Sequence, residues 1–394
     1  MKGVAVTGLG IVSSIGKDLN ENYKSLSLEK HGISFPELLG TTHRNLPVGE
    51  IKLSKSELEN ILQLNEGHRY TRAAMLGIMA IKDLLNSSGY KEFPKDTAFI
   101  SGTSVGGIDT TEKLYTDYPK NTQNRRFIEA QHPGFTTEQI AEYFNLKSFV
   151  TTISTACSSS ANAIMLGARM IRSGKLKRVI VGGSDCLTKF TLNGFNSLKI
   201  LSPDKCLPFD NSRNGLNLGE AAAYLILEAD ELCGSRHVYG RLTGYGNAND
   251  AYHQTASSEN GDGAYLAMFK ALEVANLNPA NVDYINAHGT GTINNDLSES
   301  RALQRIFGKV MRSFSSTKAF TGHTLAAAGA VEAVFSLLAL KHQEIFPNLN
   351  FKSEMEETGL RPVTRIKSEK INTILSNSFG FGGNCTSLIF QADE

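Results

Sequence analysis

Cys157 is the residue of this chain whose type and setting most directly suggest covalent chemistry. It lies in the run Ser154–Ala161 (STACSSSA), between the β-branched segment 149–153 and the small, apolar segment 161–171. This pattern predicts a strand that turns into a helix, with the cysteine beside the first free N–H groups of the helix. Those groups favour a thiolate, so we expect a lowered thiol pKa, and they can also bind an oxyanion. A buried, unreactive cysteine is the alternative.

Two histidines lie in glycine-rich loops next to predicted strands and helices. His288 follows the strand-like segment 282–285, and His323 precedes a run of small and apolar residues that predicts a buried helix. Loops at the ends of strands are where α/β sheets bind ligands. A thiol together with two imidazoles can form a nucleophilic site. A zinc site built from the same three side chains lacks the usual ligand spacing.

Other glycine-rich segments narrow the chemistry further. The loop 378–384 (SFGFGGN) can expose backbone N–H groups, although a tight turn between two strands is the alternative. Gly8, Gly10 and Gly16 do not have the spacing of a dinucleotide-binding loop. The segment 102–107 lacks the Gly-Lys-Ser/Thr of a P-loop. We therefore expect no nucleotide cofactor.

The bulk composition excludes several classes of protein. The chain has 394 residues and a formal net charge of +1, which points to neither nucleic acid nor a membrane surface as a partner. Its five cysteines are scattered without paired spacing, which is typical of a reducing compartment rather than a disulfide or metal framework. Neither a signal peptide nor an uninterrupted apolar run long enough to span a membrane is visible. We expect a cytoplasmic protein.

Alternating strand-like and helix-like segments predict an α/β protein, and the chain contains an internal repeat. Four segments of the first half recur in the same order in the second. The matched pairs are 6–10 with 242–246, 73–103 with 264–290, the Cys157 turn and helix with the His323 turn and helix, and 224–231 with 387–394. Their unequal spacing indicates an old duplication with insertions. We predict two similar halves, 1–236 and 237–394, whose loops bring Cys157 and His323 together.

Taken together, the motifs resemble those of β-ketoacyl–acyl carrier protein synthases, the elongating, Cys-His-His branch of the thiolase-fold condensing enzymes. The matching motifs are Thr155-Ala156-Cys157, Pro208-Phe209-Asp210 through Gly219-Glu220-Ala221, His288-Gly289-Thr290-Gly291-Thr292, Lys318 with Gly322-His323, and Phe379-Gly380-Phe381-Gly382-Gly383. The resemblance covers essentially the whole chain. It implies a thiolase-like fold with duplicated halves in a five-layered α-β-α-β-α arrangement.

The resemblance implies how the site would work. Cys157 would take an acyl chain from a carrier-protein thioester, with its own N–H and that of Phe381 forming the oxyanion hole. Malonyl-carrier protein would then lose carbon dioxide, and the resulting carbanion would attack the acyl thioester. His288 and His323 would stabilise the enolate.

Further residues receive supporting roles from the same resemblance. Lys318 would add positive charge to the site with Glu332 as its partner, although an ordinary structural ion pair is the alternative. The remaining implied residues are Thr290 and Thr292 at the phosphopantetheine arm, Phe381 as an aromatic gate, and Val105 and Phe195 as walls of the acyl pocket. Val105 and Phe195 could equally belong to the core.

The implied partner is acyl carrier protein, whose phosphopantetheine arm carries the substrates, so no other cofactor and no metal are expected. Candidate contacts for an acidic carrier are Lys199, Lys205, Arg125 and Arg126. The family forms dimers by pairing edge strands, so we expect the strand before Cys157 to meet either a second copy or a different subunit. The polar insertion 110–137 predicts a surface cap or a subunit contact.

Alternatives remain at the level of pathway and activity. Fatty acid synthesis is one expectation; a specialised polyketide or polyene lipid pathway, with a chain-length-factor-like partner, is the other. A non-catalytic subunit would lack the nucleophile, and a cysteine hydrolase would have no use for the second histidine motif. The family loop commonly continues Gly-Gly-Thr-Asn, whereas this chain has Asn384-Cys385. Thiolases use a second cysteine, but two histidines with Lys318 fit decarboxylative condensation better.

Overall fold

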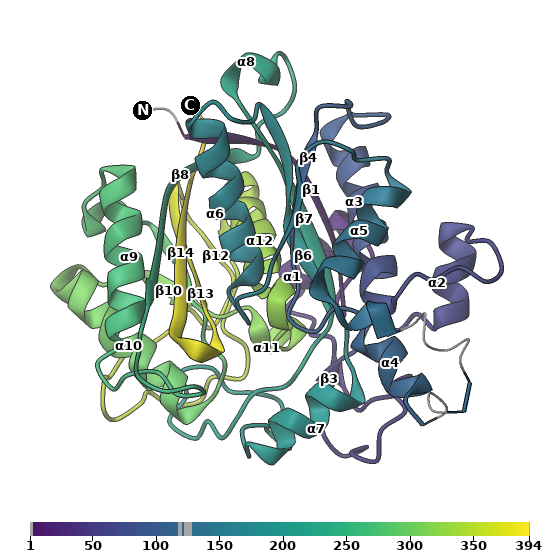
Figure 1. Cartoon of the computed structure of the whole chain (residues 1–394). Helices are drawn as coiled ribbons and strands as arrows, with labels where there is room; N and C mark the ends of the chain where they lie inside the picture. Colours follow the sequence, from purple (N-terminus) through teal and green to yellow (C-terminus); the bar gives the residue numbers. More distant parts are fainter. Residues whose placement is uncertain (1–2, 117–119, 122–127, 394) are drawn as a thin grey trace.

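The computed structural model describes residues 3–116, 120–121 and 128–393, and strands and helices alternate along the chain (Figure 1). The first half contributes β1 (Val4–Ser13), β4 (Ala98–Gly102), β5 (Val150–Ile153), β6 (Arg178–Asp185) and β7 (Ala221–Glu228). The second half contributes β8 (Gly240–Asn249), β9 (Tyr284–Asn286), β10 (Ser313–Ser315), β13 (Thr373–Phe379) and β14 (Asn384–Gln391). Two short sheets pair β2 (Ile33–Ser34) with β3 (Val48–Gly49), and β11 (Glu344–Ile345) with β12 (Lys367–Ser368).

The order of the strands reveals an approximate twofold symmetry. The 10-stranded sheet runs β10-β9-β13-β14-β8-β1-β7-β6-β4-β5. Each strand of the first half has a counterpart at the mirrored position in the second half. The counterparts are β1 and β8, β4 and β9, β5 and β10, β6 and β13, and β7 and β14. The two halves join where the start of β1 pairs antiparallel with the start of β8, at Val4 with Leu242 and Val6 with Gly240. The predicted duplication is therefore confirmed in the topology.

Helices cover and separate the two halves of the sheet. The longer ones are α3 (Arg72–Ser88), α5 (Pro133–Tyr143), α6 (Ser159–Arg172), α9 (Asp262–Ala275), α10 (Ile293–Phe307) and α12 (Ala328–His342). The shorter ones are α1 (Leu19–Ser27), α2 (Lys55–Leu62), α4 (Ile108–Leu114), α7 (Lys189–Ser197), α8 (Asp230–Cys233) and α11 (Lys318–Thr321). Helices α6 and α12 pack together between the two sets of strands, whereas α3 covers β1 and α9 covers β8 from outside (Figure 1). This is the predicted α-β-α-β-α layering.

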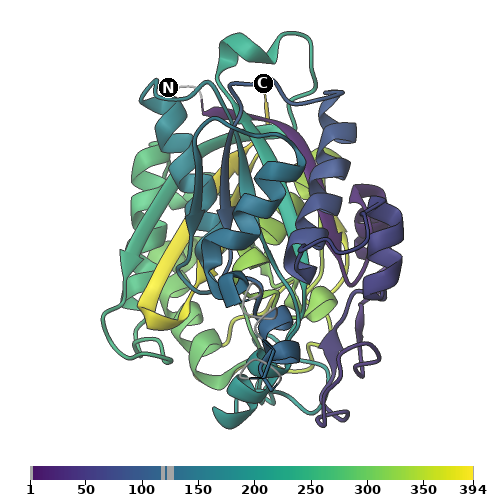
Figure 2. The same cartoon turned by 45° about the vertical axis from the view of Figure 1, so that its right-hand side comes forward.

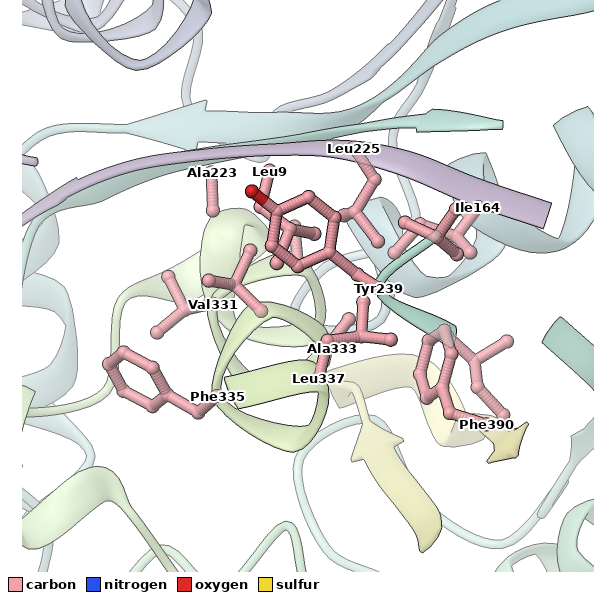
Figure 3. Close-up of a cluster of buried hydrophobic side chains, with 14 of the residues drawn as sticks. Leu9, Ile164, Ala223, Leu225, Tyr239, Val331, Ala333, Phe335, Leu337 and Phe390 are labelled. Carbon is pink, nitrogen blue, oxygen red and sulfur yellow. The ribbon is translucent and has the colours of Figure 1, made fainter. Parts of the chain in front are cut away.

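The central helix α12 explains why the two halves hold together. It is apolar on all sides, as expected for a helix surrounded by protein, and its residues from Ala328 to Leu340 are buried. Figure 3 shows Val331 and Leu337 of this helix among side chains such as Leu225 of β7. The stretch Leu325–His342 is long and apolar enough to cross a membrane, but 89% of it is buried inside the protein. It therefore serves as a core helix.

The first half carries two insertions, 17–68 and the predicted 110–137. The segment 17–68 forms α1, β2, β3 and α2 along one side of the molecule (Figure 2). Buried Glu220 attaches it to the core: its carboxylate accepts a hydrogen bond from Ile51 N–H at 3.0 Å and from Arg72 Nη2 at 2.6 Å. The insertion 110–137 is described only in part, from the end of α4 and again into α5.

Candidate active site

The turn that carries Cys157 has the strand-to-helix geometry that the sequence predicts. Strand β5 ends at Ile153 and helix α6 begins at Ser159, with Ser158 as its N-cap residue. Ala156 adopts a left-handed conformation with φ of +52°, which is uncommon for a residue with a side chain. Such local strain persists where the surroundings hold it, often at functional sites. The turn places Cys157 two residues before the first residue of α6.

The protonation state of Cys157 differs from the sequence-based expectation. The side chain is buried, and burial raises the pKa of its thiol to about 11. Hydrogen bonds from the backbone N–H groups of Phe381 and of Cys157 itself, together with the charge of Lys318, lower this pKa but do not outweigh burial. The expectation of a lowered pKa was wrong, because the enclosing second half of the chain cannot be read from the local motif.

The residue of the second half that is equivalent to Cys157 is not His323, as the repeat in the sequence suggested. Leu325 repeats the left-handed conformation of Ala156 with the same φ of +52°, three residues before α12 begins. The position equivalent to Cys157 is therefore Ala326, and His323 lies three residues earlier. The two histidines enter the site from different loops of the second half: His288 after β9 and His323 after α11.

Two histidines, one lysine and one glutamate form a compact buried group. The rings of His288 and His323 are 5.4 Å apart between centroids and nearly perpendicular. The ammonium of Lys318 donates to Nδ1 of His288 at 3.2 Å, to its carbonyl oxygen, and to a carboxylate oxygen of Glu332. Each of these side chains is at least 97% buried. The predicted Lys318–Glu332 pair therefore exists and contacts the histidine directly.

This arrangement fixes the chemical form of the imidazoles. A lysine ammonium can only donate, so Nδ1 of His288 must be the acceptor and its Nε2 carries the hydrogen. Burial, with Lys318 and His323 nearby, lowers the pKa of His288 well below its usual value. Burial and Lys318 lower the pKa of His323 in the same way. Both rings are thus neutral near pH 7. Burial raises the pKa of Glu332, while Lys318 opposes the rise.

Buried carboxylates that the sequence analysis missed hold the His288 loop in place. Glu299 accepts hydrogen bonds from the backbone N–H groups of His288 at 2.9 Å and Gly289 at 2.8 Å. Asp296 accepts from Thr290 N–H at 2.9 Å. Both lie one turn apart on α10 and both are buried. The sequence does contain a signal for these carboxylates: two acidic residues three positions apart follow a glycine-rich loop.

A third missed carboxylate joins the two halves near the nucleophile. Asp185, at the end of β6, accepts from Ser104 N–H at 3.0 Å and Val105 N–H at 3.3 Å in the first half. It also accepts from Ala326 N–H at 2.9 Å in the second half. It is fully buried, and burial raises its pKa. Asp185 thus ties the turn before α12 to the loop after β4.

One cavity of about 240 Å³ connects most of the predicted site residues. Cys157, His288 and His323 all line it. Residues that line it and had other predicted roles are Thr290, Thr292, Phe195, Phe381, Lys199 and Cys385. The hydroxyls of the two threonines are 2.9 Å apart. The ring of Phe381 stacks on that of Phe195 with centroids 5.6 Å apart.

Several residues with predicted roles do not line this cavity, and two others lie outside the residues that the structure describes. Val105 does not line the cavity; it packs against a small apolar cluster that Phe195 also contacts. Lys199 is exposed at the cavity, and Lys205 is exposed on the surface. Arg125 and Arg126 lie outside the described residues. Cys385 is buried, and burial raises the pKa of its thiol.

A buried thiol, two neutral imidazoles and two backbone N–H donors lie around one cavity, an arrangement suited to an enzyme with a cysteine nucleophile. Comparison with known proteins places this enzyme in a family. Residues 1–232 match the model of the β-ketoacyl synthase N-terminal domain, and residues 239–352 match that of the C-terminal domain. The chain belongs to the β-ketoacyl synthase family and is an acyltransferase-type condensing enzyme.

Individual relatives span the whole chain. It is 30% identical over 411 residues to 3-oxoacyl-[acyl-carrier-protein] synthase 2 of Staphylococcus aureus, which covers 100% of this chain and 99% of the relative. Among solved structures it is similar to the ishigamide ketosynthase/chain length factor, with a TM-score of 0.93, 26% identity and full coverage of both chains. It also resembles the ketosynthase ApeO in complex with its chain length factor ApeC from Xenorhabdus doucetiae, with a TM-score of 0.85, 31% identity and coverage of 100% and 98%.

Proposed function

We propose that Cys157, His288, His323 and Lys318 are the catalytic residues of a decarboxylative condensation that yields 3-oxoacyl-carrier protein. The observation that carries this proposal is the shared cavity of the thiol and both imidazoles, with Lys318 holding Nδ1 of His288. Glu332 balances the lysine charge from the far side. The substrates arrive on the phosphopantetheine arm of acyl carrier protein, so no further cofactor is needed.

The first step transfers the acyl chain to the enzyme. The sulfur of Cys157 attacks the thioester carbonyl, the N–H groups of Cys157 and Phe381 stabilise the oxyanion, and the bond to the pantetheine sulfur breaks. The thiol proton ends on the departing pantetheine sulfur. Because burial raises the pKa of the free thiol to about 11, the thiol is mostly protonated near pH 7 and has to lose this proton before or during the attack.

The second step forms the carbon–carbon bond. Malonyl-carrier protein loses carbon dioxide, and the electron pair of the broken bond becomes an enolate. Nε2–H of His288 and an N–H of His323 donate to the enolate oxygen, a role that suits neutral imidazoles in a buried site. The α-carbon then attacks the acyl thioester, the bond to the sulfur of Cys157 breaks, and the thiolate takes up one proton from solvent.

The cavity mouth supports recognition of the carrier arm. Thr290 and Thr292 line the cavity, and their hydroxyls suit the amides of phosphopantetheine; the stacked rings of Phe381 and Phe195 line the same cavity. Lys199 is an exposed cation at this mouth and a candidate contact for an acidic carrier protein. We assign the enzyme to the cytoplasm.

Mass spectrometry of the intact protein tests the proposed residues. We expect a mass increase after exposure to a panel of acyl-carrier thioesters, and its loss in Cys157→Ala. His288→Ala and His323→Ala should still acylate but condense with malonyl-carrier protein about 10²–10³-fold more slowly, because each removes one donor to the developing charge. Condensation by Cys157→Ala would show that another residue is the nucleophile.

A specialised lipid or polyketide pathway is the second candidate. It is favoured by the likeness to the ketosynthase ApeO, which was solved with a chain length factor. The acyl panel separates the two: a saturated primer accepted by the protein alone supports fatty acid synthesis. A requirement for a second subunit, or a preference for conjugated unsaturated primers, supports the specialised pathway.

A further inference from the structure

Asn384 lies where the sequence departs from the pattern that the family commonly shows, and its side chain is the centre of a hydrogen-bond network. Its Oδ1 accepts from Ser158 Oγ at 2.8 Å, Asn162 Nδ2 at 2.8 Å and Asn247 Nδ2 at 3.0 Å. The two amide NH₂ groups can only donate, so the orientation of the Asn384 amide is fixed. Two amide N–H donors therefore hold this oxygen, and the single Ser158 hydroxyl hydrogen is shared between it and the Thr155 carbonyl oxygen, also at 2.8 Å.

The network crosses the boundary between the halves of the molecule. Ser158 and Asn162 belong to the first turn of α6, which follows Cys157, whereas Asn247 is on β8 and Asn384 begins β14. Asn162 also donates to Thr155 Oγ1 at 2.9 Å, on the other side of the nucleophile. The side chain of Asn384 is therefore hydrogen-bonded to residues that hold the turn of Cys157.

The backbone of the same residue shapes the loop that carries Phe381. The carbonyl of Asn384 accepts from Gly380 N–H at 2.8 Å, which closes the turn around Phe381. That turn packs so closely on the nucleophile that a Cβ on Gly380 would lie 2.9 Å from the carbonyl oxygen of Thr155. One residue thus contacts both segments whose N–H groups face the sulfur.

We propose that Asn384 is a positioning residue that aligns the N–H groups of Cys157 and Phe381 into one oxyanion hole across the two halves. This inference rests on the proposed function, because it concerns the acylation step. An oxyanion donor contributes about 10²–10³-fold to rate, and a misplacement near 1 Å can cost about 10²-fold. Loss of the Asn384 amide should therefore slow acylation without preventing substrate binding.

Asn384→Leu tests the proposal because it removes the acceptor while keeping a similar volume. In single-turnover acylation with the best acyl-carrier thioester of the panel, we expect the saturating rate to fall about 10–100-fold. The half-saturating concentration should stay within about threefold. Alkylation of Cys157 by iodoacetamide needs no oxyanion hole and should also stay within about threefold. If this variant does not fold, Asn384→Ser, whose hydroxyl is too short to reach all three donors, is assayed in its place.

Thr386→Val is the matched control. Thr386 Oγ1 donates to Asn162 at 2.8 Å and accepts from Asn247 at 2.9 Å, but among the described residues no side-chain hydrogen bond joins it to Ser158 or to the Phe381 turn. We expect loss of stability with acylation within about twofold of the wild type. The proposal is overturned if Asn384→Leu acylates at the wild-type rate, or if both variants lose acylation in step with stability. If the wild type forms no acyl-Cys157 with any thioester, the proposed function itself fails and the inference falls with it.

Discussion

At the scale of single residues, charge in this site is balanced by neighbours rather than by water. Lys318 is buried, and its ammonium meets the Glu332 carboxylate on one side and the His288 imidazole on the other. An unpaired buried charge would be strongly destabilising, whereas this one is compensated. The lysine has two consequences at once: it disfavours protonation of both histidines, and it holds His288 in the tautomer that donates from Nε2.

The buried thiol gives a prediction about the pH dependence of its reactivity. Because the pKa of Cys157 is raised to about 11, the thiolate fraction should still grow about tenfold per pH unit between pH 8 and 10. Iodoacetamide alkylation, followed by peptide mass mapping to single out Cys157, measures this rate. A rate that levels off above about pH 9, as expected for an ordinary cysteine with a pKa of about 8.5, would contradict it.

At the scale of elements, the edge strand β5 combines two roles. It leads directly into the Cys157 turn, and it ends the sheet, since no strand in the described part of the chain pairs with its outer edge. The carbonyls of Phe149 and Ile153 accept from the β4 side at 2.8 and 3.1 Å. Alternate residues therefore direct the N–H groups of Val150 and Thr152 away from β4. These groups are free to pair with a second subunit.

We predict that Val150→Pro abolishes dimers while the monomer stays folded. Proline removes an N–H that would pair across the subunit interface, and an edge strand tolerates it because that N–H has no backbone partner among the described residues. Size-exclusion chromatography with light scattering gives the mass, and circular dichroism reports the fold. Val150→Thr, which keeps the N–H, is the control and should remain dimeric. A dimeric Val150→Pro variant would show that the interface lies elsewhere.

Elements were predictable where the pattern was local. The run of small residues after Cys157 became α6, the segment 73–85 became most of α3, and the apolar run after His323 became α12. The equivalence of Cys157 with Ala326 was not predictable, because it depends on a backbone conformation at Leu325 that no residue type signals. The boundary at 236/237 stays a prediction.

At the scale of the whole molecule, two neutral buried histidines make stability sensitive to acid. In the unfolded chain a histidine takes up a proton below about pH 6.5, whereas burial and Lys318 keep His323 neutral in the folded state. The unfolded state then binds more protons, so this residue's contribution to stability falls as the pH falls. Buried acids with raised pKa values, such as Glu299, contribute in the opposite direction.

A comparison with His323→Gln isolates the histidine. We expect the free energy of unfolding of this variant, relative to the wild type, to rise by about 1.4 kcal/mol for each pH unit below 6.5. Urea denaturation at fixed protein concentration at pH 7.5, 6.0 and 5.0 measures it. Between pH 7.5 and 8.5 the difference should be constant, which serves as an internal control. A difference that does not change on acidification would mean that His323 is protonated in the folded protein.

The sequence by itself determined the class of fold and the repeat, and it singled out Cys157, His288 and His323, which line one cavity in the structure. Those features depend on short segments: a strand that runs into a small-residue helix, glycines beside histidines, and similar segments in the same order. Such patterns can be read from the sequence because a helix or a strand depends on the backbone geometry and apolar spacing of residues that are neighbours in the chain.

Only the tertiary structure decided the electrostatics of the site and the residues that hold it. The pKa of Cys157 rises because its side chain is buried, and Asp185 and Asn384 act through hydrogen bonds to segments far along the chain. Burial is a sum over distant parts of the chain, so a local motif cannot reveal it. The type of each reactive group was therefore readable from the sequence, but its protonation and alignment were not.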